Sequence, residues 1–212
     1  MTGATTYLTI ARHGQAEIEV KRSRFLCDLR RVDSEDAARE VLAAIRKQHW
    51  GAGHHCSAMI IGADAAIERS NDDGEPSGTA GAPMLEVLRG HGVSNVLAVV
   101  SRWFGGTLLG SGGLARAYGD GVRAALEDLP LVRRSLVEEF TVAVDHNRAG
   151  RVENDLRSRG VQVLSTEYAE RALIRVGAAA GHRDQLESTL AEVMSEQVDL
   201  IPVGSSWVDS AR

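Results

Sequence analysis

The last third of the chain contains a complete pattern of secondary structure, and this pattern constrains the fold most strongly. From Leu136 onward the sequence reads as a strand (VEEFTVAVDH), a helix ending at Gly160, two strands (VQVLSTEY and RALIRVGA), a helix (DQLESTLAEVMSE) and a last strand near residues 197–203. Both helices place apolar side chains on one face at helical spacing. This stretch therefore predicts a β-α-β-β-α-β unit that needs nothing from the residues before it.

The order β-α-β-β-α-β is that of a ferredoxin-like domain. We therefore expect an α+β protein of two domains, residues 1–133 and residues 134–212, with a short linker between Pro130 and Ser135. From residue 136 onward, 13 acidic side chains face 8 basic ones, so the whole net charge of −5 comes from this part of the chain. Its bulk field makes the second domain a poor binder of nucleic acid.

The first domain reads as strands covered by helices. KRSRFLCDLRRV alternates between apolar and polar residues as a strand with one wet face does, and its outer face is basic. HHCSAMIIG and NVLAVVS are apolar throughout, which is typical of strands buried on both faces. Between these strands we expect helices after Asp33 or Ser34, over Pro83–Arg89, and from about Gly113 to a stop at Pro130.

Composition indicates a globular protein without a membrane segment. The chain is 43% hydrophobic and 25% charged, and it has no apolar run of the roughly 18 residues that a spanning helix needs. Its first residues lack the layout of a signal peptide. We therefore expect a cytoplasmic protein, in which Cys27 and Cys56 are free thiols.

Seven glycines fall within SRWFGGTLLGSGGLARAYGDG, residues 101–121. A buried strand ends where this stretch begins and a helix starts within it, so its backbone amides can bind an anion. A P-loop is excluded, because Ser-Gly follows the Gly-x-x-x-x-Gly spacing where Lys-Ser/Thr is required. A dinucleotide fold is not favoured, because the glycines come too long after the strand. The alternative is that the glycines only allow tight turns and close packing.

A second cluster, SNDDGEPSGTAGAPML, gathers acidic and hydroxyl side chains on a turn. It lacks the ligand spacing of an EF-hand, and a solvated turn with capping hydroxyls is the simpler interpretation. A zinc site at His54-His55-Cys56 is not expected, because adjacent residues of a strand point to opposite faces. The candidate ligand residues of this region are His54, Asp72, Asp73, Glu75, Ser77 and Thr79.

The strings KRSRFL, HHCSAMIIG, SNDDGEPSGTAGAPMLEVL and SRWFGGTLLGSGGLARAYGDGV, in this order and spacing, resemble the YigZ/IMPACT family over about residues 16–128. The last unit resembles the carboxy-terminal module of bacterial YigZ proteins, which is similar in fold to a domain of translational elongation factors. The sequence departs from the family pattern at Trp103, Ser101 and His55, where family members often have Tyr, Thr and Asn.

The resemblance implies a ribosomal-protein-like α/β sandwich for the first domain and a role around translation. Eukaryotic IMPACT is a protein-binding regulator that restrains an amino-acid-starvation kinase through a shared partner. For bacterial members the implied partners are nucleic acid or the ribosome, and no reaction is established. The kinase pathway does not carry over to a two-module protein of the bacterial type.

We therefore expect a non-enzymatic regulatory or binding protein of the translation apparatus, without catalytic residues, metal or cofactor. Its first domain would hold RNA phosphate or a protein carboxylate, and its acidic second domain would add a protein contact. The oligomeric state stays open. The residues expected to supply charge are Arg22, Arg24, Arg102 and Arg116, and those expected to supply backbone donors are Gly105, Gly106, Gly112 and Gly113.

Two alternatives stay open. The first is an enzyme acting on a small phosphorylated or nucleotide ligand, with Asp72, Asp73 or Glu75 holding Mg²⁺ beside the glycine stretch. The second is a protein that interacts only with other proteins and binds no anion.

Overall fold

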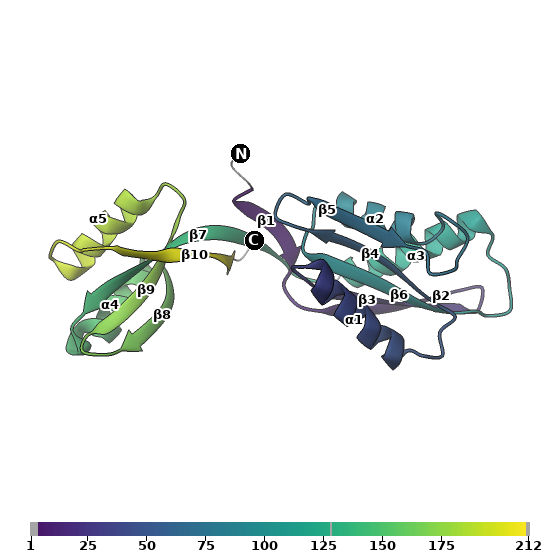
Figure 1. The fold of residues 1–212 in the computed structure, drawn as a ribbon, viewed down its shortest axis with the longest axis horizontal. Coiled ribbons are helices and arrows are strands. Elements are labelled where there is room, and N and C mark those ends of the chain that lie inside the picture. Colours follow the sequence, from purple (N-terminus) through teal and green to yellow (C-terminus); the bar gives the residue numbers. More distant parts are fainter. Residues whose placement is uncertain (1–3, 128, 211–212) are drawn as a thin grey trace. The chain divides into compact units, whose positions relative to one another are not determined.

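The computed structural model describes residues 4–127 and 129–210, and it contains two compact units (Figure 1). The division falls between Arg133 and Arg134. Each unit combines helices with a sheet, so the predicted α+β class and two-domain organisation are confirmed.

The first unit is built on a five-stranded sheet with the strand order β2-β3-β6-β4-β5. These strands are β2 (Gly14–Val20), β3 (Ser23–Arg31), β4 (His54–Ile61), β5 (Ile67–Asn71) and β6 (Val96–Trp103). All four pairings between them are antiparallel. The central strand β6 is buried along nearly its whole length, as its uninterrupted apolar run predicts.

Helices cover both faces of this sheet (Figure 1). On one face α1 (Glu35–Gln48) packs its Ala38 and Ile45 against Leu97 and Val99 of β6. The sequence leaves Asp33 or Ser34 as the residue before this helix. In the structure Ser34 caps α1 by accepting a hydrogen bond from the amide of Ala37.

On the opposite face lie α2 (Gly81–Gly90) and α3 (Ser111–Glu127), which enclose the main core with the inward side chains of β3, β4 and β6. Both helices start two residues earlier than the sequence predicts. For α2 the reason is a cap supplied by a distant side chain, that of Asp72.

The second unit follows the predicted element order. It contains β7 (Leu131–Val144), which begins in the first unit, α4 (His146–Ser158), β8 (Gln162–Tyr168), β9 (Ala172–Ala179), α5 (Arg183–Met194) and β10 (Ile201–Ser210). β9 lies between β7 and β8, and β10 pairs with β7. This unit has a hydrophobic core of its own, in which both helices bury their apolar faces.

Three strands of the first unit are not predicted by the sequence: β1 (Thr6–Ile10), β2 and β5. β2 and β5 are edge strands whose residues are mostly part-exposed or exposed, so they carry little of the apolar signal that marks a strand. β1 is held by hydrogen bonds from the Ser94 amide to the Leu8 carbonyl and from the Ala11 amide to the Pro130 carbonyl. Among the described residues, no helix is long and apolar enough to cross a membrane.

Candidate functional site

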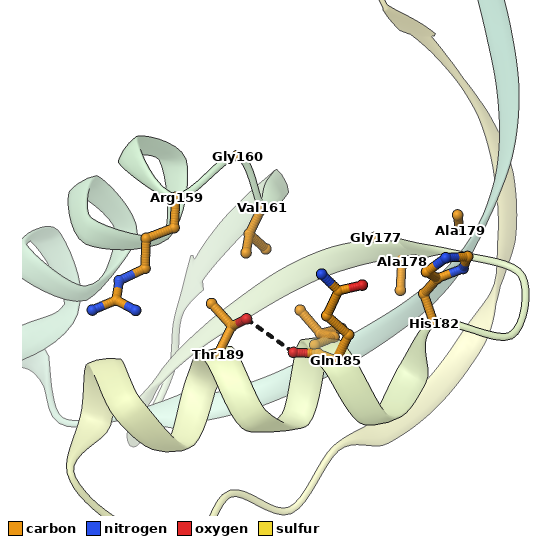
Figure 2. Close-up of a pocket in the computed structure, with 10 residues that line it drawn as sticks. Arg159, Gly160, Val161, Gly177, Ala178, Ala179, His182, Gln185 and Thr189 are labelled. Atoms are coloured by element: carbon orange, nitrogen blue, oxygen red, sulfur yellow. Dashed lines mark hydrogen bonds between the residues drawn. The ribbon is translucent and has the colours of Figure 1, made fainter.

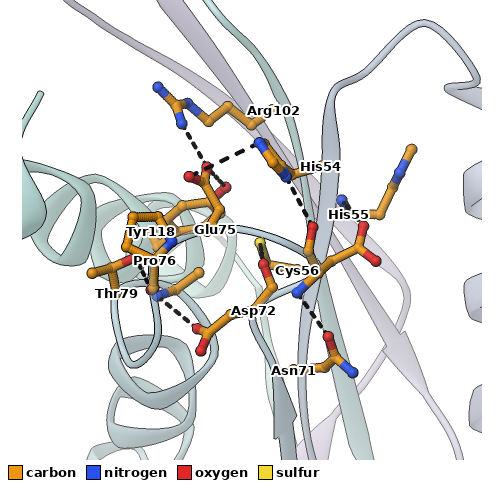
Figure 3. Close-up of polar contacts among 12 residues, drawn as sticks. His54, His55, Cys56, Asn71, Asp72, Glu75, Pro76, Thr79, Arg102 and Tyr118 are labelled. Atoms are coloured by element: carbon orange, nitrogen blue, oxygen red, sulfur yellow. Dashed lines mark hydrogen bonds and ion pairs between the residues drawn. The ribbon is translucent and has the colours of Figure 1, made fainter. Parts of the chain in front are cut away.

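Two clusters that are separate in the sequence meet at one place in the first unit (Figure 3). Arg102, near the end of β6, pairs in register with His54, the first residue of β4. The turn between β5 and α2 lies beside them and brings the acidic residues of the second cluster. The site is therefore formed by the ends of two adjacent strands and one connecting turn.

At the centre of this site Glu75 accepts two hydrogen bonds on the same oxygen. Arg102 Nη1 and the Tyr118 hydroxyl each donate to Glu75 Oε1 over 2.6 Å. The side chains of Glu75 and Arg102 are only 3% and 7% exposed. On the other side of the carboxylate, His54 Nε2 lies 4.0 Å from Glu75 Oε2. The charge of Arg102 is therefore neutralised inside the protein.

Asp72 caps helix α2 from eight residues before its cap position. Its Oδ1 accepts hydrogen bonds from the amides of Ala80 and Gly81, over 3.0 and 2.8 Å, and its Oδ2 accepts one from the Gly78 amide over 2.8 Å. Burial alone would raise the pKa of Asp72, but these three backbone donors outweigh it and hold the pKa below its usual value. The carboxylate thus replaces the side-chain cap that Ala80 cannot provide.

Asp73 joins the turn to the first residues of β4 and to α1. Its Oδ2 accepts from the His55 amide over 2.7 Å, and its carbonyl oxygen lies 2.8 Å from His54 Nδ1. Its other carboxylate oxygen pairs with Arg46. The backbone of Asp73 has a positive φ of 45°, and Gly74 follows at 87°, so the turn is tight.

The remaining candidate ligands of the turn differ in exposure. Thr79 is buried and donates a hydrogen bond of 2.6 Å to the carbonyl of Pro76, whereas Ser77 is exposed. The carboxylates of Asp72, Asp73 and Glu75 all accept hydrogen bonds from the protein itself. Within the described residues, no group of three or more His, Cys, Asp or Glu side chains is placed to hold a metal ion. The structure therefore offers no specific observation in favour of the Mg²⁺ enzyme.

Cys56 and Tyr118 contact the acidic turn from the buried side, at Asp72 and Glu75 respectively. Burial raises the pKa of the Cys56 thiol to about 12, and it also raises the pKa of the Tyr118 hydroxyl. Cys56 donates to the Asp72 carbonyl over 3.0 Å. Both cysteines of the chain are free and buried. A buried neutral thiol is a poor nucleophile, and the hydrogen bond of Cys56 joins β4 to the turn.

The glycine stretch is fixed to the turn between β2 and β3. The Gly105 amide donates to Ser23 Oγ over 3.0 Å, and Arg22 Nη2 donates to Thr107 Oγ1 over 3.2 Å. A Cβ on Gly105 would lie 2.0 Å from the carbonyl carbon of Arg22. Gly105 therefore serves close packing, which is the alternative that the sequence left open for these glycines.

The backbone amides after Gly105 differ from that of Gly105 in their hydrogen bonding. Within the described part of the chain, the amides from Gly106 to Gly113 donate to no protein acceptor, and the next one, of Leu114, donates to the Gly110 carbonyl as α3 begins. Gly106, Gly110 and Gly112 are exposed. The amides of this segment are thus available to a ligand at the start of a helix.

The four candidate arginines are in different environments. Arg102 does not project beside the glycine stretch as expected, because its guanidinium is buried against Glu75. Arg24 makes a bidentate contact with Glu17 and lies over the ring of Trp103. Arg22 and Arg116 are exposed, and Arg22 contacts the stretch directly.

The sequence does not identify Ser23, Thr107 or Tyr118 as parts of this region. It predicts Tyr118 only as a core residue of α3, because helical spacing reports the buried face but not the hydroxyl partner. Ser23 and Thr107 are small hydroxyl residues without a motif, so their spacing carries no signal.

The second unit contains a cavity of about 230 Å³ between the α4–β8 connection, the end of β9 and α5 (Figure 2). None of the predicted site residues lines it. Arg159, on its edge, pairs with Glu192, and the Thr189 hydroxyl donates to the Gln185 carbonyl. These two polar groups at the cavity are thus used within the unit.

Both units match models of known protein families. Residues 21–126 match the family model of the Impact N-terminal domain, and residues 142–197 match a domain of unknown function, DUF1949. The IMPACT family member YvyE of Bacillus subtilis is 45% identical over 165 residues, which cover 78% of this chain and 76% of YvyE. The IMPACT family member YigZ of Escherichia coli is 36% identical over 187 residues, 87% of this chain and 92% of YigZ.

Solved structures also match. A crystal structure described as that of a hypothetical protein is 34% identical and has a TM-score of 0.64, covering 96% of this chain and 98% of its own. The structure of the two-domain translational regulator Yih1 matches 57% of this chain and 47% of its own at 26% identity. Its TM-score of 0.35 is below the level at which two folds correspond.

Proposed function

This chain belongs to the IMPACT family, and on that premise we propose that it is a non-enzymatic regulator of translation whose first unit binds RNA. The RNA phosphates would lie on the backbone amides between Gly106 and Gly113. The role in translation comes from what the family resemblance implies, and the site comes from the geometry of the glycine stretch. This RNA binding would take place in the cytoplasm, with ribosome-associated RNA as the ligand.

The observation that carries this proposal is the run of backbone amides without protein acceptors, among the residues described, at the start of α3. Such amides, together with the helix dipole behind them, favour a phosphate group. Arg22 adds a fixed positive charge, because its guanidinium is held against Thr107 within the same segment. Charged hydrogen bonds from arginine to phosphate are among the stronger ones in proteins.

Exposed apolar groups in the same segment favour RNA over a protein carboxylate. Phe104 and Leu108 are 59% and 82% exposed at the two sides of the Gly105-Gly106 pair. An aromatic ring beside phosphate-binding amides is the combination that single nucleotides use, with the base on the ring and the phosphate on the backbone. The acidic second unit would then make the protein contact expected of a regulator.

The chemistry of the acidic turn favours binding over catalysis. Asp72 caps a helix, Asp73 joins the turn to a strand, and Glu75 neutralises a buried arginine. Each carboxylate that could act as a metal ligand or a base thus already has a role in holding the turn and the strand ends together.

The test is RNA affinity as a function of salt, measured with a fluorescently labelled RNA of about 12 nucleotides. The double variant Arg22→Ala with Arg116→Ala should bind more weakly and show a shallower dependence of log affinity on log salt, by about 0.7 for each phosphate that the variant no longer neutralises. The matched control is Arg151→Ala, which removes an 88% exposed arginine from the second unit. If the double variant keeps both the affinity and the salt slope of the wild type, the proposed RNA site is wrong.

A further inference from the structure

We propose that the first unit binds single-stranded rather than double-stranded RNA, and that one unpaired base stacks on the indole ring of Trp50. This inference rests on the proposed RNA function and names the form of RNA that the site takes. It concerns the connection between α1 and β4, which is hydrogen-bonded to the end of β6 that leads into the glycine stretch.

Trp50 is the most exposed large apolar side chain among the described residues, at 84%. It lies in the short connection between α1 and β4. The residues on either side of it approach Trp103 at the end of β6: the rings of His49 and Trp103 meet edge to face at 5.8 Å, and a Cβ on Gly51 would lie 3.8 Å from Trp103 Nε1. Leaving an indole in water forfeits the free energy of burying it, so a ligand that covers the ring would be favoured.

The backbone that carries Trp50 is held in place on both sides. The His49 amide donates to the Ile45 carbonyl, and the Ala52 amide donates to the His49 carbonyl, each over 2.9 Å. The Gly53 amide then donates to the Arg102 carbonyl over 2.9 Å. The connection is therefore anchored before a ligand arrives, which lowers the entropy cost of binding.

Trp103, which the neighbours of Trp50 contact, is only partly exposed and has an arginine over its ring. The Arg24 guanidinium lies 4.8 Å from the centre of the Trp103 ring, and Arg24 is held there by its bidentate contact with Glu17. The exposed indole of Trp50, carried on this anchored connection, is called the platform below. Stacking on aromatic rings and on arginine is the common way in which proteins hold bases without reading their sequence.

The positive charges near the platform fit a nucleic acid strand. Lys47 lies in the last turn of helix α1, just before Trp50, and Lys21 lies with Arg22 in the turn between β2 and β3. Arg46, beside Lys47, is already paired with Asp73. The chain has no lysines other than Lys21 and Lys47. Both are exposed; Lys47 lies three residues before Trp50, and Lys21 lies in the turn before β3, whose Arg24 pairs in register with Trp103.

A base can reach the platform only if it is unpaired. In an RNA duplex the base faces are covered by their neighbours, and the deep, narrow major groove excludes large side chains. The phosphates, by contrast, are available in both forms of RNA. The amides of the glycine stretch therefore support binding to either form, whereas Trp50, like Phe104, can hold a base only from a single strand.

The experiment compares a labelled 12-nucleotide uridine-rich RNA, about the length used for the salt titration, with the same strand annealed to its complement. We expect the wild type to bind the single strand more tightly. Trp50→Ala should weaken single-strand binding roughly 10-fold, within the range measured for one stacked base, and should leave duplex binding unchanged. Its salt slope should equal that of the wild type, because no charge is removed.

Two further variants separate stacking from loss of structure. Trp50→Phe keeps an aromatic face and should restore most of the single-strand affinity. Tyr168→Ala removes an aromatic side chain that is 65% exposed in the second unit and should have no effect. If Trp50→Phe binds as weakly as Trp50→Ala, the effect is not stacking and the inference is overturned.

The outcomes also separate this inference from the function on which it rests. If Trp50→Ala binds both RNAs like the wild type while Arg22→Ala with Arg116→Ala lowers the salt slope, the amide site stands and the stacking platform is wrong. If the wild type binds neither RNA, both proposals fall. If a labelled oligoglutamate peptide binds instead and depends on Trp50, the platform takes acidic protein segments and the RNA inference is overturned.

Discussion

Arg102 donates a 2.6 Å hydrogen bond to Glu75, and the two side chains are buried together between the end of β6 and the turn before α2. An isolated charge at such a position would be very unfavourable, so each residue is tolerated only because the other is present. Rings of Phe25 and Phe104 lie 5.4 and 5.7 Å from the guanidinium and complete its surroundings. The pair therefore holds the glycine stretch and the acidic turn in one arrangement.

Removing one partner of this pair should destabilise the first unit strongly. For Arg102→Met we expect the free energy of unfolding to fall by about 3–5 kcal/mol, because Glu75 is left buried without its counter-charge. Urea denaturation followed by tryptophan fluorescence measures the loss. Adding Glu75→Leu to Arg102→Met should restore part of it. The matched control, Arg69→Met, breaks a solvent-exposed pair with Glu35 and should cost no more than about 1 kcal/mol. Equal effects of the two single variants would contradict this account.

Two glycines of the stretch should respond in opposite ways to alanine. At Gly105 a Cβ would lie 2.0 to 2.4 Å from backbone atoms of Arg22 and Ser23, so Gly105→Ala must displace the β2–β3 turn. We expect a loss of at least about 1–3 kcal/mol in stability, as for an overpacked site. At Gly112 no atom lies within 4 Å of the added Cβ, so Gly112→Ala should be neutral or stabilise by up to about 1 kcal/mol. Thermal unfolding of the two variants side by side is the measurement, and a Gly105→Ala protein as stable as the wild type would refute this close packing.

Asp72 should contribute a stability that depends on acid pH. Its pKa is lowered in the folded protein, so this contribution is present above its unfolded value of about 3.9 and is lost as the pH falls through the lower folded value. Asp72→Asn should therefore be less stable than the wild type at neutral pH, by about 1–3 kcal/mol, and the difference should shrink as the pH falls below about 4. Urea midpoints at a series of pH values test this. A difference that stays constant into the acid range would show that the carboxylate charge does not matter.

The comparison of sequence with structure shows which features can be predicted. The sequence predicts the order of the elements in the second unit, because most of them carry a clear apolar period, as in Leu186 and Leu190 of α5. The last strand is predicted near residues 197–203 but runs over Ile201–Ser210, and its residues 201–209 are exposed or only partly buried. The sequence misses the edge strand β5, whose residues are mostly polar and which is ordered only by pairing with β4. Spacing also places Arg102 next to the glycine stretch. It does not predict on which side of the sheet the guanidinium of Arg102 lies. That side is set by the register with His54 and by the partner Glu75, which is 27 residues away in the chain.

Cys56 should make the first unit sensitive to alkaline pH. Burial raises its pKa to about 12, compared with about 8.5 for an unfolded cysteine. The neutral thiol is favoured by folding, so its contribution to stability is fully present below about pH 8.5 and is lost progressively as the pH rises toward 12. Between these values the stability of the wild type should fall by up to about 1.4 kcal/mol per pH unit from this group alone.

The variant Cys56→Ala isolates this contribution from other groups that titrate in the same range. It should lose some stability at neutral pH, because the hydrogen bond to the Asp72 carbonyl and part of the packing are gone. Its urea midpoint should then fall less steeply than that of the wild type as the pH rises from about 8.5 to about 10.5. Iodoacetamide at about pH 8.5 provides a second measurement, since the thiolate is the reactive form and the folded protein holds almost none. Alkylation of Cys56 in the folded protein as fast as in urea would mean that the thiol is accessible, and its assignment to the buried side of the acidic turn would be wrong.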